Sequence, residues 1–152
     1  RVDVTTADEM YEAALQAFDA CDGAVMCAAV ADYRPAQVAG QKIKKDSAAW
    51  DLALEPTRDI ARELGQRKGD KLLVGFALET EKEREHAAAK LEKKNLDFIV
   101  LNSLADPGAG FGGDTNRITI LDREGRVRDY ALKSKAEAAR DIVDEIEKYF
   151  CS

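Results

Sequence analysis

The sequence predicts an α/β fold: a Rossmann-like open, mostly parallel sheet with flanking helices and a C-terminal β-hairpin. Segments of strand length alternate with segments of helical periodicity along the whole chain. The strand-like segments 24–30, 71–79 and 96–102 are apolar almost throughout, as expected of strands buried on both faces of a parallel sheet. Residues 117–132 alternate around the turn sequence "DREG", which is typical of a hairpin.

Periodicity and breaker residues set the expected order of the elements. Thr6 is a candidate N-cap for the first helix. A stretch with four glycines and a proline, residues 103–115, predicts a long loop. Strands are expected at 2–4, 24–30, 50–54, 71–79, 96–102, 117–121 and 126–132, and helices at 7–20, 57–68, 80–94 and 134–149.

Composition narrows the class of protein. The 152 residues are 45% hydrophobic and 34% charged, which suits one well-solvated domain with a real core. The net charge of −6 argues against a nucleic-acid polymer or an anionic membrane as partner. No apolar run approaches the roughly 20 residues that span a bilayer. The cysteines, Cys21, Cys27 and Cys151, have no metal-ligand spacing, and His86 is the only histidine, so we expect reduced thiols in a cytoplasmic protein.

The first candidate site follows strand 24–30. In open α/β sheets, ligands bind beyond the carboxyl ends of the strands. Asp32 lies at such an end and could accept hydrogen bonds from a ligand, while small residues such as Ala28 would let a flat ring approach the backbone. The alternative is that Asp32 only caps a helix.

A cluster of lysines follows in the stretch "KIKK". If this stretch is extended, Lys42 and Lys44 point to one face and Lys45 to the other. Two ammonium groups on one face repel each other unless an anion lies between them, so a phosphate chain is a natural ligand. A solvated loop explains the same lysines equally well.

Further candidates lie on strand 71–79 and on the helix after it. Lys82, His86, Lys90 and Lys94 are spaced by four, and the last two flank the apolar side of the helix. They either point towards the sheet edge or form salt bridges with neighbouring glutamates. Phe76 is either a core residue or a ring that packs against a nucleobase.

The glycine-rich stretch "PGAGFGGDTN" is not a P-loop, because it lacks the Gly-Lys-Ser/Thr ending, and no GxGxxG follows a strand here. Its glycine density favours a flap that closes on a ligand, although a plain surface loop is equally compatible. The flap candidates are Gly110, Phe111, Gly112, Gly113, Asp114 and Asn116.

Five segments, in order, resemble one family. "AAVADYRP", "KIKK", "LVGFALET", "KKNLDFIVLN" and "GFGGDTNRITI" are similar to the phosphopantothenoylcysteine synthetase (phosphopantothenate–cysteine ligase) domain of the bacterial bifunctional coenzyme A biosynthesis flavoprotein. The likeness runs from about residue 2 to the C-terminus. "ADYRP" with "KIKK" resembles the bacterial type, which uses CTP.

The resemblance implies a two-step ligation. The carboxylate of 4′-phosphopantothenate attacks the α-phosphate of CTP, which gives an acyl-cytidylate and pyrophosphate. The amine of cysteine then displaces CMP. Negative charge gathers on phosphate oxygens, so Mg²⁺ is expected with CTP, its protein ligands being unknown. No FMN is expected on this chain, because the decarboxylase half of the bifunctional protein is absent from it.

The resemblance also implies roles for single residues. Lys42 would be the catalytic lysine that contacts the triphosphate. Arg58 departs from the family pattern, because relatives often have Pro between Thr or Asn and Asp; Asp59 matches it. The nucleotide-binding positions implied are Ala28, Asp32, Lys42, Arg58, Asp59, Ile60, Ala61, Phe76, Lys90 and Lys94.

One family segment is missing. The sequence lacks the N-terminal glycine-rich strand–loop–helix with its Asn-x-x-Ser-Gly-x-Met-Gly signature. We therefore expect residues 1–152 to be a single ligase domain that lacks this segment and is inactive alone. The family implies a homodimer, with the 117–132 hairpin as a candidate contact, and a fused FMN-dependent decarboxylase domain in the full-length protein. A non-catalytic nucleotide-binding module remains an alternative, as does an NAD(P)-dependent oxidoreductase, which the missing GxGxxG weakens.

Overall fold

A five-stranded sheet forms the centre of the computed structural model, which describes residues 1–44, 51–79, 83–103 and 113–151. Its order is β1-β4-β5-β7-β8. The first three strands are parallel, and β7 and β8 continue the sheet in antiparallel fashion, so the predicted fold class with its C-terminal hairpin is confirmed. The strands are β1 (Gly23–Met26), β4 (Leu72–Glu79), β5 (Phe98–Ser103), β7 (Ile118–Asp122) and β8 (Val127–Asp129).

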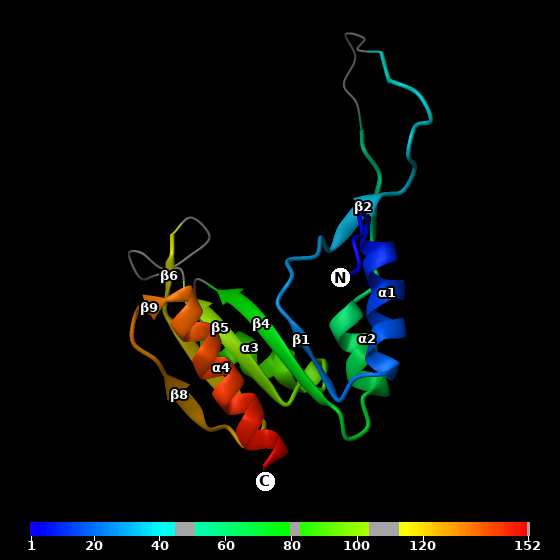
Figure 1. Ribbon diagram of the computed structural model, residues 1–152. Coiled ribbons are helices and arrows are strands. Elements are labelled where there is room, and N and C mark those ends of the chain that lie inside the picture. Colours follow the sequence, from blue (N-terminus) through cyan, green and yellow to red (C-terminus); the bar gives the residue numbers. More distant parts are fainter. Residues whose placement is uncertain (45–50, 80–82, 104–112, 152) are drawn as a thin grey trace.

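Helices cover both faces of this sheet (Figure 1). On one face, α1, α2 and α3 pack through Phe18, Leu64 and Ala87. On the other face, α4 packs through Ala138 and Ile142 against the opposite side chains of the same strands. Because side chains alternate along a strand, adjacent strand residues serve the two cores. The helices are α1 (Ala7–Asp19), α2 (Ile60–Arg67), α3 (Glu83–Lys93) and α4 (Lys135–Phe150).

Side-chain caps fix where the helices begin. Thr6 forms a capping box with Glu9 at the start of α1, which confirms the predicted N-cap. Ser134 forms a second capping box with Glu137 at the start of α4. Asp59 caps α2, so that this helix begins at residue 60 rather than at the predicted residue 57.

A two-stranded ribbon carries an arm away from the sheet (Figure 1). Strand β2 (Tyr33–Pro35) pairs in antiparallel fashion with β3 (Leu54–Pro56), and the arm, residues 36–44 and 51–53, continues beyond them. The predicted strand 50–54 is therefore wrong over residues 51–53, because the pairing with β2 begins only at Leu54. A second ribbon joins β6 (Thr115–Asn116) to β9 (Lys133–Ser134).

Three further strand predictions need correction. Strand β8 ends at Asp129, so the predicted strand 126–132 is wrong over residues 130–132. Residues 2–4 form no strand, and Val2 is 71% exposed, because no described strand pairs with them. Strand β1 ends at Met26 rather than at residue 30, and Val25 is 45% exposed. The expected burial on both faces is not seen, because β1 lies at the edge of the described sheet and, among the described strands, pairs with β4 alone.

The described helices all lack the length and apolar content needed to cross a membrane. Most of the predicted loop 103–115 lies outside the described residues, and Thr115 belongs to β6.

Candidate functional site

A cavity of about 180 Å³ opens at the carboxyl end of β1 and beside the middle of β4, on the face covered by α2 and α3. This is the edge of an open α/β sheet where ligands usually bind. Apart from Lys42, the cavity brings together all the positions that the family resemblance assigned to the nucleotide. They are Ala28, Asp32, Arg58, Asp59, Ile60, Ala61, Phe76, Lys90 and Lys94.

The floor of the cavity is apolar. Met26, Ile60, Leu96 and Ile99 line it. Gly75 also lines it. A Cβ at this position would lie 2.5 Å from Cδ1 of Leu96, so the absence of a side chain at Gly75 leaves space for the side chain of Leu96. The sequence carried a signal for this residue, because a glycine inside an apolar strand often marks a close approach.

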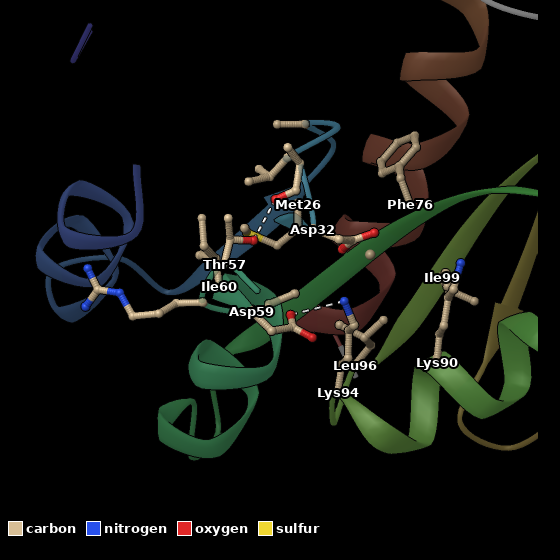
Figure 2. Close-up of a pocket in the computed structure, with 16 residues that line it drawn as sticks. Met26, Asp32, Thr57, Asp59, Ile60, Phe76, Lys90, Lys94, Leu96 and Ile99 are labelled. Carbon is tan, nitrogen blue, oxygen red and sulfur yellow. Dashed lines mark hydrogen bonds and ion pairs between the residues drawn. The ribbon is translucent and has the colours of Figure 1, made fainter. Parts of the chain in front are cut away.

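Thr57 holds the main chain at one side of the mouth (Figure 2). Its hydroxyl donates to the carbonyl of Ala31 at 2.6 Å, and its backbone N–H donates to the carbonyl of Asp32 at 2.9 Å. The carboxylate of Asp32 makes no hydrogen bond or ion pair with the described residues. Sequence reasoning missed Thr57, because its partners are main-chain carbonyls 25 or more positions earlier in the chain.

Positive charge lines the opposite wall. The ammonium group of Lys94 lies 3.1 Å from Oδ1 of Asp59 (Figure 2). The same oxygen accepts the backbone N–H of Arg62. Lys90, one turn earlier on the same helix, also lines the cavity. The amino end of α2 is at this wall too, and a helix amino end attracts anions. Phosphate groups are suitable ligands for such a wall.

Arg58 directs its charge away from the cavity. Its guanidinium lies 3.7 Å above the ring of Tyr11. It also contacts Glu12 at 2.8 Å and Asp8 at 3.2 Å, all on α1. The cation is therefore neutralised by two carboxylates, and we expect only the backbone of Arg58 to serve a ligand.

The remaining predicted residues lie elsewhere. Lys42 is exposed on the arm and does not line the cavity, so its contact with a triphosphate stays a prediction. Of the flap candidates, Gly110, Phe111 and Gly112 lie outside the described residues. The others are in or near β6: the carbonyl of Asp114 accepts the backbone N–H of Lys135 at 2.9 Å, and Gly113 and Asn116 flank it.

Metal-ligating side chains do not gather in the described ranges, where no group of three or more His, Cys, Asp or Glu residues could hold an ion. The carboxylates available at the cavity are those of Asp32 and Asp59.

Comparisons with known proteins relate the chain to coenzyme A biosynthesis proteins. It is 43% identical over 145 residues to the coenzyme A biosynthesis bifunctional protein CoaBC of Bacillus subtilis, over 95% of this chain and 36% of that protein. It is also 53% identical over 146 residues to the cysteine/cysteine sulfinic acid decarboxylase of an unknown prokaryotic organism, over 95% of this chain and 41% of that protein. The chain thus spans less than half the length of these curated relatives.

Solved structures agree with this kinship. The C-terminal domain of a coenzyme A biosynthesis bifunctional protein CoaBC matches with a TM-score of 0.78 and 39% identity, over 98% of this chain and 67% of that one. A complex of the Cab2 mutant H337A with phosphopantothenate-cysteine matches with a TM-score of 0.77, over 99% of this chain and 53% of that one; at 16% identity it shows the shared fold alone.

The family model described as "DNA/pantothenate metabolism flavoprotein C-terminal domain" matches residues 1–150. The match covers nearly the whole chain, which confirms the resemblance inferred from the motifs. The chain belongs to this family of C-terminal domains.

Proposed function

We propose that this chain binds CTP and serves the CTP-dependent ligation of 4′-phosphopantothenate with cysteine. The observation that carries the proposal is that all the nucleotide positions implied by the motifs, except Lys42, line one cavity. Two similarities support it: the relatives include coenzyme A biosynthesis proteins, and a protein of the same fold is solved with phosphopantothenate-cysteine.

The cavity is matched to part of a nucleotide. At about 180 Å³ it is smaller than the roughly 300 Å³ at which ligand pockets usually begin, so the rest of the nucleotide would lie outside it. The apolar floor beside Ala28 suits the base. The wall with Lys90 and Lys94 suits the phosphates, whose charge it would stabilise. The carboxylate of Asp32, which has no partner among the described residues, would accept hydrogen bonds from hydroxyl or amino groups of the nucleotide.

The proposed reaction needs charge stabilisation more than acid–base catalysis. A carboxylate oxygen of the acid forms a bond to the α-phosphorus, and the bond from phosphorus to the pyrophosphate oxygen breaks. The cysteine nitrogen then bonds to the acyl carbon and loses a proton, while the bond to CMP breaks. Both steps move negative charge onto phosphate oxygens, which the lysines would face. We place Lys42 with this group, because the base of its arm borders the cavity through Thr57.

The residues at the cavity fit Mg²⁺ bound together with CTP. Protein sites for this ion commonly use one or two carboxylates and complete the shell with phosphate oxygens and water. Asp32 has a carboxylate without a described partner, whereas Asp59 is engaged by Lys94. One carboxylate oxygen of Asp32 would therefore contact the ion, while the other would accept the hydrogen bond from the nucleotide. When bound, the ion would neutralise phosphate charge.

Calorimetric titration with CTP, ATP and NADH in the presence of Mg²⁺ tests the proposal. We expect a preference for CTP, lost in Lys42→Gln and weakened about tenfold in Lys94→Gln, since a charge-assisted contact contributes about 1.5–3 kcal/mol. Lys93→Gln is the matched control, because Lys93 is exposed on the same helix and does not line the cavity.

Other outcomes identify other functions. Equal, weak binding of all three compounds would favour a generic nucleotide-binding module. A preference for NADH would favour an oxidoreductase. Release of CO₂ from cysteine or cysteine sulfinate would instead support the activity named for the decarboxylase relative.

A further inference from the structure

A network of charged side chains lies where the base of the arm meets α1. Figure 1 shows β2 beside the amino end of this helix, at the point where the arm leaves the body of the protein. Arg34 of β2 forms an ion pair with Asp8, in the first turn of α1. Neither side chain lines the cavity proposed for the nucleotide (the nucleotide cavity), so direct contact with a ligand there does not explain the pair.

Two carboxylates hold the guanidinium of Arg34. Its Nε lies 2.8 Å from Oε1 of Glu55, the residue opposite Arg34 in the β2–β3 ribbon. Its Nη1 pairs with Oδ2 of Asp8. Because a guanidinium is planar and rigid, contacts at two of its nitrogens fix its direction as well as its position. The ribbon is thereby oriented on α1.

Asp8 also accepts a second guanidinium. Its other oxygen, Oδ1, lies 3.2 Å from Nε of Arg58, which directly precedes the cap of α2. Arg58 is held in turn by Glu12 at 2.8 Å and by the ring of Tyr11 at 3.7 Å. The carboxylate of Asp8 therefore bridges the strand that leads into the arm and the segment that follows the arm.

These ion pairs are too exposed to contribute much to the stability of the fold. The side chains of Asp8, Arg34 and Arg58 are 38%, 46% and 45% exposed. Solvent screens pairs of this kind, and they add little to the free energy of unfolding. The bridge at Asp8 is therefore better suited to orienting the arm than to stabilising the protein.

The mouth of the nucleotide cavity is held separately. Thr57 donates its hydroxyl and its backbone N–H to the main chain after β1, and these bonds do not involve Asp8. Loss of Asp8 would keep them and would free the β2–β3 ribbon to tilt on α1. The arm continues from this ribbon, and its residues 36–44 include Lys42. A tilt would therefore displace Lys42 more than it would change the cavity.

We propose that Asp8 is a positioning residue for the nucleotide site, because it holds the arm in the direction in which Lys42 reaches the triphosphate. This inference rests on the function proposed above. The sign of its effect is informative. By Coulomb attraction alone, removal of a negative charge near the site of a polyanion strengthens binding, whereas loss of positioning weakens it.

Calorimetric titration of the whole chain with CTP and Mg²⁺ tests this role. Asp8→Ala removes both oxygens of the bridge, and we expect about fivefold weaker CTP binding, as part of one charge-assisted contact is lost. Asp8→Glu keeps the carboxylate and should restore most of the affinity. Glu12→Ala is the matched control, because it removes the same charge from the same helix and has no contact with Arg34. It should leave the affinity unchanged.

A double-mutant cycle separates positioning from a general structural effect. In the Lys42→Gln background, Asp8→Ala should weaken CTP binding no further, because the arm no longer carries the contact that Asp8 places. Thr57→Val, which acts at the mouth of the cavity, should still weaken binding in that background. An effect of Asp8→Ala that is equal with and without Lys42 would overturn the inference, and so would tighter CTP binding in Asp8→Ala.

Hydrogen exchange followed by mass spectrometry tests the hold on the arm without any ligand. Amides of the β2–β3 ribbon should exchange faster in Asp8→Ala than in the unmodified chain or in Glu12→Ala. Thermal unfolding followed by circular dichroism should give nearly the same midpoint for all three proteins, because the pairs are exposed. Unchanged exchange in the ribbon would overturn the inference whatever the titrations show. Faster exchange with no CTP binding by the unmodified chain would instead support the hold on the arm and overturn the proposed function, and with it the role in nucleotide binding.

Discussion

At the scale of single residues, the mouth of the nucleotide cavity depends on the hydroxyl of Thr57. It is the group that ties β3 to the main chain just before Asp32. Thr57→Val keeps the side-chain shape and removes the donor. Since a hydrogen bond contributes about 1 kcal/mol net, we expect about fivefold weaker CTP binding by calorimetry. Thr57→Ser keeps the donor and should bind like the unmodified chain; equal losses in both variants would contradict this role.

From the sequence, we could identify site residues that belong to a recognisable motif. We missed residues whose role depends on contacts between distant parts of the chain. Asp32, Lys90 and Lys94, which the family resemblance assigned to the nucleotide, line one cavity, and their contact with a nucleotide stays a prediction. The role of Thr57 appears only when β3 is seen beside the chain after β1, because its partners are backbone carbonyls. The sequence also could not show which carboxylates pair with the guanidinium of Arg58, since these partners on α1 are some 50 residues away in the sequence.

At the scale of elements, the cavity wall depends on how closely α2 approaches the end of α3. Gly65 makes this possible, because a Cβ there would lie 1.9 Å from the backbone carbonyl oxygen of Lys94. The contact is fixed by Asn95, whose side-chain amide donates to the carbonyl of Gly65 at 2.6 Å. A glycine inside a helix therefore has a packing reason that outweighs its low helix propensity.

Gly65→Ala should therefore destabilise the fold. Alanine stabilises a helix by about 1 kcal/mol relative to glycine, but overpacking its Cβ against a backbone atom costs about 1–3 kcal/mol or more. We expect a net loss of about 2 kcal/mol in the free energy of unfolding, measured with urea. Gly40→Ala is the control, because nothing lies within 4 Å of a Cβ on the arm at that position. A Gly65→Ala variant as stable as this control would contradict the close approach.

Element predictions succeeded where the signal is local. The stripe of apolar residues and the capping residue Thr6 give α1 to within one residue at its end. Strand 24–30 was predicted too long and too buried, because apolar residues indicate burial but not which neighbours provide it. An edge position depends on the order of strands in the sheet, which the local sequence does not contain.

At the scale of the whole molecule, a buried ion pair joins the end of α2 to the strands. The ammonium group of Lys68 lies 2.5 Å and 2.6 Å from the carboxylate oxygens of Asp97, which also accepts the backbone N–H of Leu73. Both side chains are less than 9% exposed. Nothing in the sequence pattern marked this pair, which forms only when the end of α2 has packed beside the start of β5.

Lys68→Met should cost far more stability than the loss of a surface pair. Without Lys68, the buried Asp97 carboxylate keeps only the guanidinium of Arg123, whose Nε lies 3.5 Å away, so we expect the loss to be near the lower end of the about 3–5 kcal/mol that breaking a buried pair costs. Arg67→Met is the matched control, because Arg67 and Glu63 form a more exposed pair on the same helix, of the kind that contributes about 0.3–0.5 kcal/mol. Urea unfolding of both variants provides the comparison, and similar losses would show that the buried pair has no special role.

A second charge network holds α4 to the hairpin, and it makes the stability of the whole fold sensitive to acid. Glu145 on α4 contacts Lys148 at 2.8 Å, Arg128 at 3.0 Å and the hydroxyl of Tyr130 at 3.1 Å. Burial opposes ionisation of Glu145, but the hydrogen bond from Lys148 and the charge of Arg128 outweigh it, so the pKa of this carboxyl lies below its ordinary 4.5. The same surroundings, burial first and the Glu145 charge second, raise the pKa of Tyr130 to about 12.

The sign of the pH dependence follows from the lowered pKa of Glu145. Because the unfolded chain binds the proton more readily, this carboxylate stabilises the fold fully above pH 4.5, and the contribution disappears as the pH falls through the lower pKa of the folded state. Urea unfolding between pH 3 and pH 7, in about half-unit steps, measures this loss. Glu145→Gln removes the titrating group, so its stability should fall less steeply below pH 4.5 than that of the unmodified chain. Glu147→Gln, exposed on the same helix, should keep the original slope, and identical curves for all three proteins would contradict a role for Glu145.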